Sequence, residues 1–191
     1  MRIIAGRYKG RRLNAPSWGG LRPTSDRLKE TLFNVLGDRV VGARVLDGYA
    51  GSGALGIEAL SRGARAVTFI DADPRAVGLA EANLTHCGIA EGYVMICASL
   101  TEAVDRLPAD QLFELILLDP PYEQSELVDV LASATARLAP DGILVLEHAR
   151  RRSVPAEVAA LTRFRIVTAG DSALALYRLG GVAADTAGEE V

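Results

Sequence analysis

From about residue 43 onward, short aliphatic and β-branched runs alternate with segments of helical period, and this alternation limits the possible folds more than any other feature. The runs are nearly continuous in apolar residues, which is typical of strands buried on both faces of a parallel sheet. The segments between them are long enough for helical crossovers. The expected strands are Arg44–Asp47, Ala66–Asp71, Tyr93–Cys97, Leu115–Asp119 and Ile143–Glu147. The expected helices are Ala54–Arg62, Pro74–His86, Leu100–Leu107 and Glu126–Leu138.

The end of the chain has a different pattern. Two strand-like runs, Phe164–Thr168 and Ala173–Leu179, are separated by only four residues, which is too short for a helical crossover. They predict a hairpin whose last strand runs antiparallel to the others. The sequence therefore predicts an α/β fold: a mainly parallel, seven-stranded sheet with a C-terminal antiparallel hairpin and helices on both faces. Residues 181–191 have little to bury, and we expect a flexible tail there.

The region before the sheet divides into two parts. Residues 1–21 contain Gly6 and Gly10 among short polar and apolar residues, and we expect a small basic β-hairpin extension there. Residues 22–180 would form the main domain. It would open with a helix whose leucines share one apolar stripe and which Gly37 would end.

Charge is unevenly distributed along the chain. The net charge is −3, yet the first 30 residues carry eight basic and two acidic side chains, against 13 basic and 22 acidic in the rest. A basic arm on an acidic body is expected of a protein that meets phosphate at one edge. A solvated surface strand explains the same charges equally well.

Several classes of protein are excluded by composition. Apolar residues make up 49% of the chain and charged residues 24%, which indicates a globular protein. The two cysteines and two histidines predict neither a disulfide framework nor a metal site. No apolar run is long enough for a membrane helix, and no secretory signal is recognisable. We therefore expect a cytoplasmic protein that does not associate with membranes.

The first expected strand leads into a glycine-rich turn, Asp47 to Gly53 (DGYAGSG), which a helix follows. Glycine allows a sharp turn and the close approach of a ligand, and a helix N-terminus offers free N–H groups to that ligand. Asp71 ends the next strand, where an acid accepts hydrogen bonds from ribose hydroxyls in doubly wound folds. These features favour a nucleotide-like cofactor, although a tight turn without a ligand remains a possible interpretation.

The same segment also matches the dinucleotide fingerprint G-x-G-x-x-G, with Asp71 20 residues after Gly51, so a nicotinamide enzyme is a competing hypothesis. Asp47 argues against it. A carboxylate at this position would repel a pyrophosphate and would suit an ammonium group, such as that of the methionine part of S-adenosylmethionine.

The fourth expected strand ends in Asp119-Pro120-Pro121-Tyr122, on the sheet edge where ligands of such folds bind. Two prolines stiffen the backbone and remove N–H donors. The Asp119 carboxylate and the Pro120 carbonyl remain as acceptors, and Tyr122 adds an aromatic face. This arrangement suits the exocyclic amine of a stacked base, held so that its lone pair can attack a sulfonium methyl. A strand-to-loop stop with a surface tyrosine is the simpler interpretation.

Four segments together resemble a known family, the bacterial 16S ribosomal RNA guanine-N2 methyltransferases of the RsmD type. They are MRIIAGRYKGRRL (1–13), RPTSDRLKE (22–30), LDGYAGSGALGIEALSRGA (46–64) and LDPPY (118–122). The resemblance implies a class I, Rossmann-like, S-adenosylmethionine-dependent methyltransferase fold. It also implies methylation of the exocyclic amine of one guanine in 16S rRNA, either free or in the assembling small subunit.

The resemblance also implies roles for individual residues. Cofactor contacts would come from Asp47, Gly48, Tyr49, Gly51, Gly53, Asp71, Ala98, Ser99, Asp119, Arg22 and Thr24. The target amine would be held by Asp119, Pro120, Pro121 and Tyr122. Phosphates of the rRNA would be contacted by Arg7, Lys9, Arg11, Arg12 and Arg22. Ala98 departs from the Asp or Asn common in the family, so Ser99 or a backbone carbonyl would have to contact the adenine amine.

Three alternatives remain open. The Asp-Pro-Pro-Tyr loop serves several amines, so a DNA amino-methyltransferase acting on adenine N6 or cytosine N4 is the runner-up. An NAD-dependent oxidoreductase ranks below it, together with a catalytically silent RNA-binding module. Nothing in the sequence requires more than a monomer.

Overall fold

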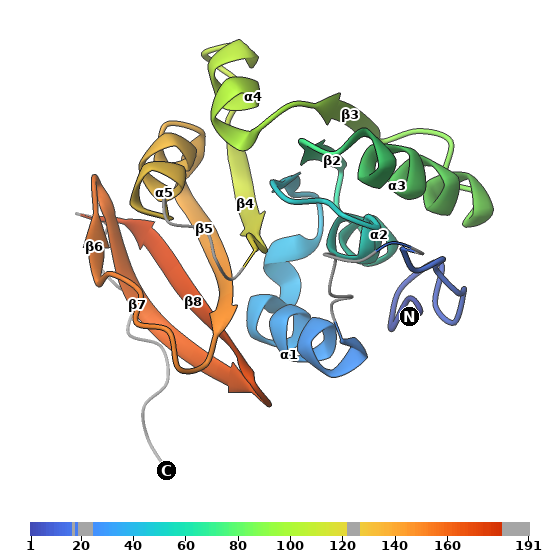
Figure 1. The fold of residues 1–191 in the computed structure, drawn as a ribbon, viewed down its shortest axis with the longest axis horizontal. Helices are drawn as coiled ribbons and strands as arrows, with labels where there is room; N and C mark the ends of the chain where they lie inside the picture. Colours follow the sequence, from blue (N-terminus) through green and yellow to red (C-terminus); the bar gives the residue numbers. More distant parts are fainter. Residues whose placement is uncertain (17, 19–24, 122–126, 181–191) are drawn as a thin grey trace.

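The computed structural model describes residues 1–16, 18, 25–121 and 127–180. Within them one eight-stranded sheet has the order β3-β2-β1-β4-β5-β8-β7-β6 (Figure 1). The strands are β1 (Arg44–Asp47), β2 (Ala66–Asp71), β3 (Tyr93–Cys97), β4 (Phe113–Leu118), β5 (Leu138–Ala149), β6 (Glu157–Val158), β7 (Leu161–Ala169) and β8 (Ser172–Leu179). The helices are α1 (Asp26–Leu36), η1 (Gly37–Val40, a 3-10 turn), α2 (Ala54–Ser61), α3 (Pro74–His86), α4 (Leu100–Arg106) and α5 (Leu127–Thr135).

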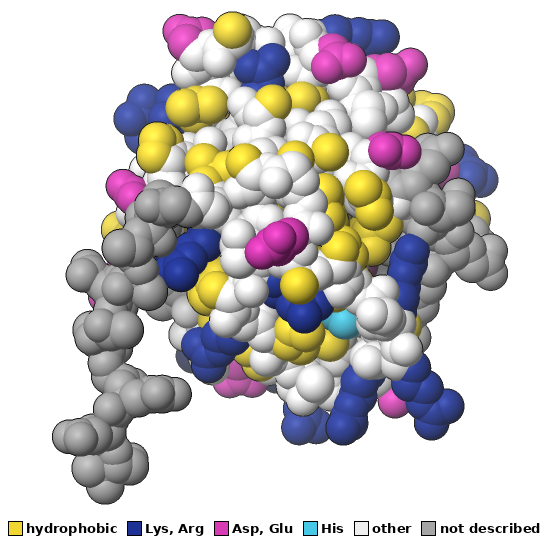
Figure 2. All heavy atoms as spheres, turned by 90° about the vertical axis from the view of Figure 1, so that its left-hand side faces the viewer, with side chains coloured by type: hydrophobic (Ala, Val, Ile, Leu, Met, Phe, Trp, Pro, Cys, Tyr) yellow, Lys and Arg dark blue, Asp and Glu magenta, His cyan; other side chains and the backbone are white. Residues whose placement is uncertain are grey.

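The topology confirms the predicted fold class. β1 to β5 run parallel, whereas β8 pairs antiparallel with both β5 and β7. The carboxyl ends of the five parallel strands therefore lie along one edge of the sheet. The outer strands are less covered: Phe164 and Ile166 of β7 are 42% and 47% exposed. Figure 2, which views this side, shows hydrophobic side chains among charged ones.

The bounds of α2, α4, β4, β7 and β8 differ from the sequence prediction by one to three residues, and three larger differences concern the architecture. The fifth strand begins at Leu138 rather than Ile143, and α5 ends at Thr135, because Leu138 pairs with Phe113 of β4. Pro140 also disfavours a helix at the residue before it. The two-residue β6 raises the strand count from seven to eight. In the N-terminal extension the expected β-hairpin is reduced to a single antiparallel bridge between Arg2 and Arg12.

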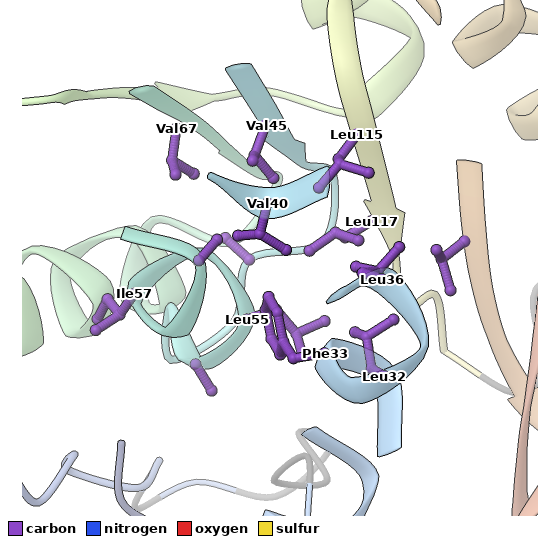
Figure 3. Packing of buried hydrophobic residues seen from close by; sticks show 14 of the residues in the cluster. Leu32, Phe33, Leu36, Val40, Val45, Leu55, Ile57, Val67, Leu115 and Leu117 are labelled. Atoms are coloured by element: carbon purple, nitrogen blue, oxygen red, sulfur yellow. The ribbon is translucent and has the colours of Figure 1, made fainter. Parts of the chain in front are cut away.

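Two apolar cores hold the helices against the sheet. One lies beneath α1, α2 and α3, and the other beneath α4 and α5. Figure 3 shows the first, where Phe33 and Leu36 of α1 face Leu55 of α2 and Leu117 of β4. Burying such side chains contributes about 1.5–3 kcal/mol each, which fixes α1 and α2 beside the carboxyl edge of the sheet.

Local signals set the bounds of α1. The Ser25 hydroxyl accepts a hydrogen bond from the Leu28 N–H at 3.1 Å, and Gly37 ends the helix with a φ of 53°. Lys29 is fully buried, and its ammonium donates to the Arg2 carbonyl and lies 3.4 Å from Asp26. No helix in the described ranges is both long and apolar enough to cross a membrane.

Candidate active site

The glycine-rich turn follows β1 and requires glycine at several positions. Gly51 and Gly53 have φ of 54° and 79°, in the left-handed region that favours glycine. A Cβ on Gly48 would lie 2.5 Å from the side chain of Leu118 in β4. The turn is therefore shaped by backbone conformation and by close approach to the neighbouring strand, and it leads directly into α2.

Asp47 is the acid of this site whose pKa is shifted most strongly. Its side chain is 1% exposed, Oδ2 accepts a hydrogen bond from the Gly56 N–H at 2.9 Å, and Oδ1 is buried without a hydrogen-bond partner in the described structure. Burial raises the pKa of Asp47 to about 7, against the hydrogen bond from Gly56, and the charges of Asp119 and Asp71 raise it further. A buried carboxylate oxygen without a donor is a natural position for a cationic group of a ligand.

Gly56, which completes the dinucleotide-like pattern, has a packing role. A Cβ at this position would lie 2.2 Å from Cε1 of Phe69 in β2. The glycine allows α2 to approach the sheet closely, as the third glycine of such motifs does. The presence of Gly56 in the G-x-G-x-x-G pattern is therefore explained by the packing of α2 against β2, and the pattern does not by itself indicate a pyrophosphate-binding site.

Asp71 braces the turn from the end of β2. One carboxylate oxygen accepts from the Gly51 N–H at 2.8 Å and the other from the Asp73 N–H at 2.9 Å. The Asp71 carbonyl also accepts from the Ala98 N–H at 3.0 Å, so the ends of β2 and β3 are joined beside the turn. Tyr49 is half-buried against the core beneath α4 and α5.

Ser99 has a local partner that the sequence interpretation missed. It caps α4: its hydroxyl lies 3.4 Å from the Glu102 N–H, and the Ser99 N–H donates to the Glu102 carboxylate at 3.1 Å. This reciprocal arrangement is the capping box, whose signal Ser-x-x-Glu is readable in the sequence. Ala98, 8% exposed, precedes it at the carboxyl edge.

The Asp119 loop shares this edge with the glycine turn. Strand β4 lies between β1 and β5, and the Gly48 N–H donates to the Leu117 carbonyl at 2.9 Å. Asp119 is half-buried, Pro120 is buried and Pro121 is exposed. The charge of Asp119 contributes to the raised pKa of Asp47, in keeping with their positions at the ends of the neighbouring strands β4 and β1.

Three of the predicted site residues, Arg22, Thr24 and Tyr122, lie outside the described residues. The structure adds another acid. Leu118 of β4 pairs with Leu146 of β5, so Glu147 lies beside Asp119, and it is 8% exposed. The signal that could have identified it is an acid directly after an apolar run, as at Asp47 and Asp71.

The N-terminal extension is anchored by a buried acid of α2. The Glu58 side chain is 0% exposed, and its carboxylate accepts from the N–H groups of Ile4 at 2.8 Å and Ala5 at 3.0 Å. Arg62 forms an ion pair with it at 2.8 Å. Because α2 is buried nearly all round, an acid within it must be paired, and the unpaired N–H groups of the extension provide its partners.

Asn83 of α3 joins the extension to the glycine turn. Its side-chain N–H group donates to the carbonyls of Asn14 at 3.1 Å and Ser52 at 2.9 Å, and its oxygen accepts from the Asn14 N–H at 2.8 Å. Asn83 is fully buried, so these hydrogen bonds are shielded from water. The extension is therefore positioned directly against the turn that begins at Asp47.

The basic side chains of the extension reach solvent. Arg7, Lys9, Arg11 and Arg12 are all exposed. The guanidinium carbons of Arg7 and Arg11 lie 5.5 and 5.0 Å from the ring centre of Tyr8, and Arg11 also donates to the Cys87 carbonyl. Beside them an open hollow of about 480 Å³ is lined by Met1, Arg2, Gly10, Arg12, Leu13 and Asp26. The extension thus presents a positive surface on a fixed backbone.

Known proteins resemble this chain over most of its length. "Putative rRNA methyltransferase YlbH" of Bacillus subtilis is 36% identical over 184 residues, 95% of this chain and 100% of that protein. "Ribosomal RNA small subunit methyltransferase D" of Escherichia coli K12 is 33% identical over 180 residues, 93% of this chain and 89% of that protein. The solved structure "Putative methyltransferase yhhF from Escherichia coli" has a TM-score of 0.81 at 32% identity, covering 94% of this chain and 97% of that one.

A more distant solved structure, SMU.776, described as "a putative methyltransferase complexed with SAH", has a TM-score of 0.63 at 12% identity, covering 76% of this chain and 48% of that chain. At this identity the similarity concerns the fold alone.

Together, the sheet order, the glycine turn and the acids along the carboxyl edge define the methyltransferase class of α/β fold. Within that class the chain belongs to the family described as "Conserved hypothetical protein 95", whose model matches residues 1–178. The resemblance to the RsmD type stated from the sequence is thereby confirmed.

Proposed function

We propose that this protein transfers a methyl group from S-adenosylmethionine to the exocyclic N2 amine of a guanine in 16S rRNA, free or within the assembling small ribosomal subunit. One observation carries the proposal: the glycine turn after β1 and the Asp119 loop after β4 lie on neighbouring strands at the same sheet edge. A cofactor held by the first and a base held by the second would therefore meet. The similarity to proteins named as rRNA methyltransferases supports RNA as the substrate.

The residues of the turn fit such a cofactor. The buried Oδ1 of Asp47 lacks a partner in the described structure, and the ammonium of the methionine group would supply one. Asp71 lies beside the turn, although both its oxygens already accept backbone N–H groups, so a ribose hydroxyl would use a remaining lone pair. When bound, S-adenosylmethionine supplies a methyl group on a positively charged sulfur.

The Asp119 loop would orient the acceptor. The Asp119 carboxylate and the Pro120 carbonyl would accept the two hydrogens of the amine, which places the nitrogen lone pair toward the methyl group. The prolines offer no competing N–H donors. As the new N–C bond forms, positive charge develops on nitrogen, and the ionised Asp119 stabilises that charge and can accept the released proton. No covalent enzyme intermediate is needed.

The proposal is tested by incubating the protein with S-adenosylmethionine and unmodified 16S rRNA or small subunits, then identifying the methylated nucleoside by mass spectrometry. We expect N2-methylguanosine. Asp119→Asn should lower the methylation rate by about 100-fold or more, while the affinity for S-adenosylhomocysteine changes by less than about threefold. Asp141→Asn, which removes an exposed carboxylate near the opposite end of β5, is the matched control.

Two results would contradict this proposal. Methylation of DNA adenine or cytosine with no product on rRNA would favour the DNA amino-methyltransferase. Binding of NADH, with no heat on titration with S-adenosylhomocysteine, would favour the nicotinamide enzyme.

A further inference from the structure

Strand β5 is followed by three consecutive arginines, Arg150–Arg152, in a tight turn that the proposed mechanism does not use. The Arg152 N–H donates to the Ala149 carbonyl at 2.8 Å, which closes the turn. The Arg150 N–H donates to the Asp171 carbonyl at 2.8 Å, which ties the turn to the connection between β7 and β8. The backbone beneath these side chains is therefore fixed.

The turn lies on the same sheet edge as the candidate active site. Leu118 pairs with Leu146, so Asp119 and Glu147 are neighbours across β4 and β5. Arg150 is three residues beyond Glu147, which is at most about 10 Å along an extended chain. In Figure 1 the N-terminal extension lies beside α2 and α3, whereas β5 lies on the other side of β1 and β4. The site is thus flanked by basic segments on both sides.

The charges of Arg150 and Arg151 are not neutralised by another side chain among the described residues. Arg150 and Arg151 are exposed, and in the part of the chain that the structure describes their guanidinium groups make no ion pair or hydrogen bond. Arg152 is half-buried and contacts the fold. Figure 2 shows Lys and Arg side chains along the lower edge of the β5–β8 side, the edge toward which β5 runs in Figure 1.

His148, 4% exposed, precedes the turn, and its Nε2 has no hydrogen-bond partner within the described residues. Burial lowers the pKa of His148, against the backbone hydrogen bonds with Ala149 and Arg152, which raise it; the charges of Arg152 and Arg163 are smaller lowering effects.

We propose that the Arg150–Arg152 turn is a second phosphate-binding surface, which takes the RNA backbone on the side of the target nucleotide opposite to the N-terminal extension. This inference rests on the proposed RNA substrate. Exposed guanidinium groups on a fixed backbone suit phosphate oxygens, to which arginine can donate two hydrogen bonds at once. An enzyme that extracts a base from its stack gains from holding the backbone on both sides of it.

The test compares two double variants that remove the same charge. Arg150→Gln with Arg151→Gln alters the turn and leaves the half-buried Arg152 in place. Arg65→Gln with Arg106→Gln alters exposed arginines just before β2 and at the end of α4, near the opposite edge of the sheet. Binding of a 16S rRNA transcript is measured from about 50 to 200 mM salt, and titration with S-adenosylhomocysteine reports on the cofactor site.

We expect the first pair to weaken RNA binding severalfold and to reduce the slope of log Kd against log salt by about 1.4, because two phosphate contacts are lost. The control pair should leave the slope unchanged, and the affinity for S-adenosylhomocysteine should stay constant in both. An unchanged slope in the first pair, or an equal change in the control, overturns the inference. An effect on small subunits that is absent with the naked transcript also overturns it, since it would point to a ribosomal protein.

Failure of this inference is distinguishable from failure of the proposed function. If the unmodified protein forms N2-methylguanosine and the slope does not change, only the second phosphate surface is refuted. If the unmodified protein forms no such product on rRNA or small subunits, the proposed function itself is refuted.

Discussion

Asp47→Asn is the substitution that most directly tests the electrostatics of the cofactor turn. The pKa of Asp47 is raised from 3.8 to about 7 in the fold. The folded protein therefore favours the protonated carboxyl. The stability that this protonated form contributes is fully present below about pH 3.8 and is lost as the pH rises to about 7. The shift of about three pH units corresponds to about 4 kcal/mol of stability between these limits.

The asparagine variant should lose this dependence. Its amide oxygen keeps the hydrogen bond from Gly56, while the amide N–H group occupies the position of Oδ1, which has no acceptor among the described residues. An unsatisfied buried donor costs about 1–3 kcal/mol. At pH 8, where wild-type Asp47 is ionised, the variant should therefore be more stable by about 1–3 kcal/mol.

Urea unfolding of both proteins from pH 5.5 to 8.5 measures this difference, and Asp141→Asn is the exposed control. Wild-type stability should fall with pH by at most about 1.4 kcal/mol per unit up to about pH 7. Affinity for S-adenosylhomocysteine should move the opposite way, rising up to about tenfold per unit below pH 7, because its ammonium pairs with the ionised carboxylate. Parallel stability curves for wild type and variant, or an equal pH dependence of affinity in both, would refute the reasoning.

Three further predictions concern packing and the extension. Gly56→Ala should destabilise the protein by about 1–3 kcal/mol because the new Cβ would meet the ring of Phe69. Gly78→Ala, on an open face of α3, should stabilise the protein by about 0.5–1 kcal/mol. Thermal unfolding of both variants measures the two changes in stability. Asn83→Leu should cost about 2–4 kcal/mol and speed hydrogen exchange in residues 1–14, and unchanged exchange would contradict its anchoring role. Charge reversal at Lys9 and Arg12 should reduce the salt dependence of RNA binding. An unchanged slope of log Kd against log salt would show that the extension does not contact the RNA.

The parallel sheet was predictable because its strands are short apolar runs with helical segments between them. Periodicity alone gave β1, β2, β3 and α3 with their observed bounds. It failed at β5, where Leu138 continues the apolar stripe of the predicted helix but pairs with Phe113 of β4 instead. Pairing with a distant strand outweighed the local pattern, and only the nearby Pro140 could have signalled the boundary.

The partners of buried polar residues were not predictable in the same way. Glu58 and Asn83 look like ordinary helix residues, and their partners in the extension are at least 53 residues away in sequence. The composition of α2, whose residues other than Glu58 and Ser61 are apolar or glycine, was the available signal. The joint placement of Asp47, Asp71 and Asp119 was predictable because all three follow apolar strands of one parallel sheet.

The hydrogen bonds from Ile4 and Ala5 to Glu58 have a consequence for how this protein can be dissected. A chain shortened at its beginning would remove both backbone N–H donors of the Glu58 carboxylate, and the loss of a hydrogen bond to a charged group costs about 1.5–3 kcal/mol. The shortened protein would lose solubility and catalysis together, for reasons unrelated to substrate recognition. The basic segment is thus an integral part of the folded unit and would not keep its shape when transplanted onto another enzyme.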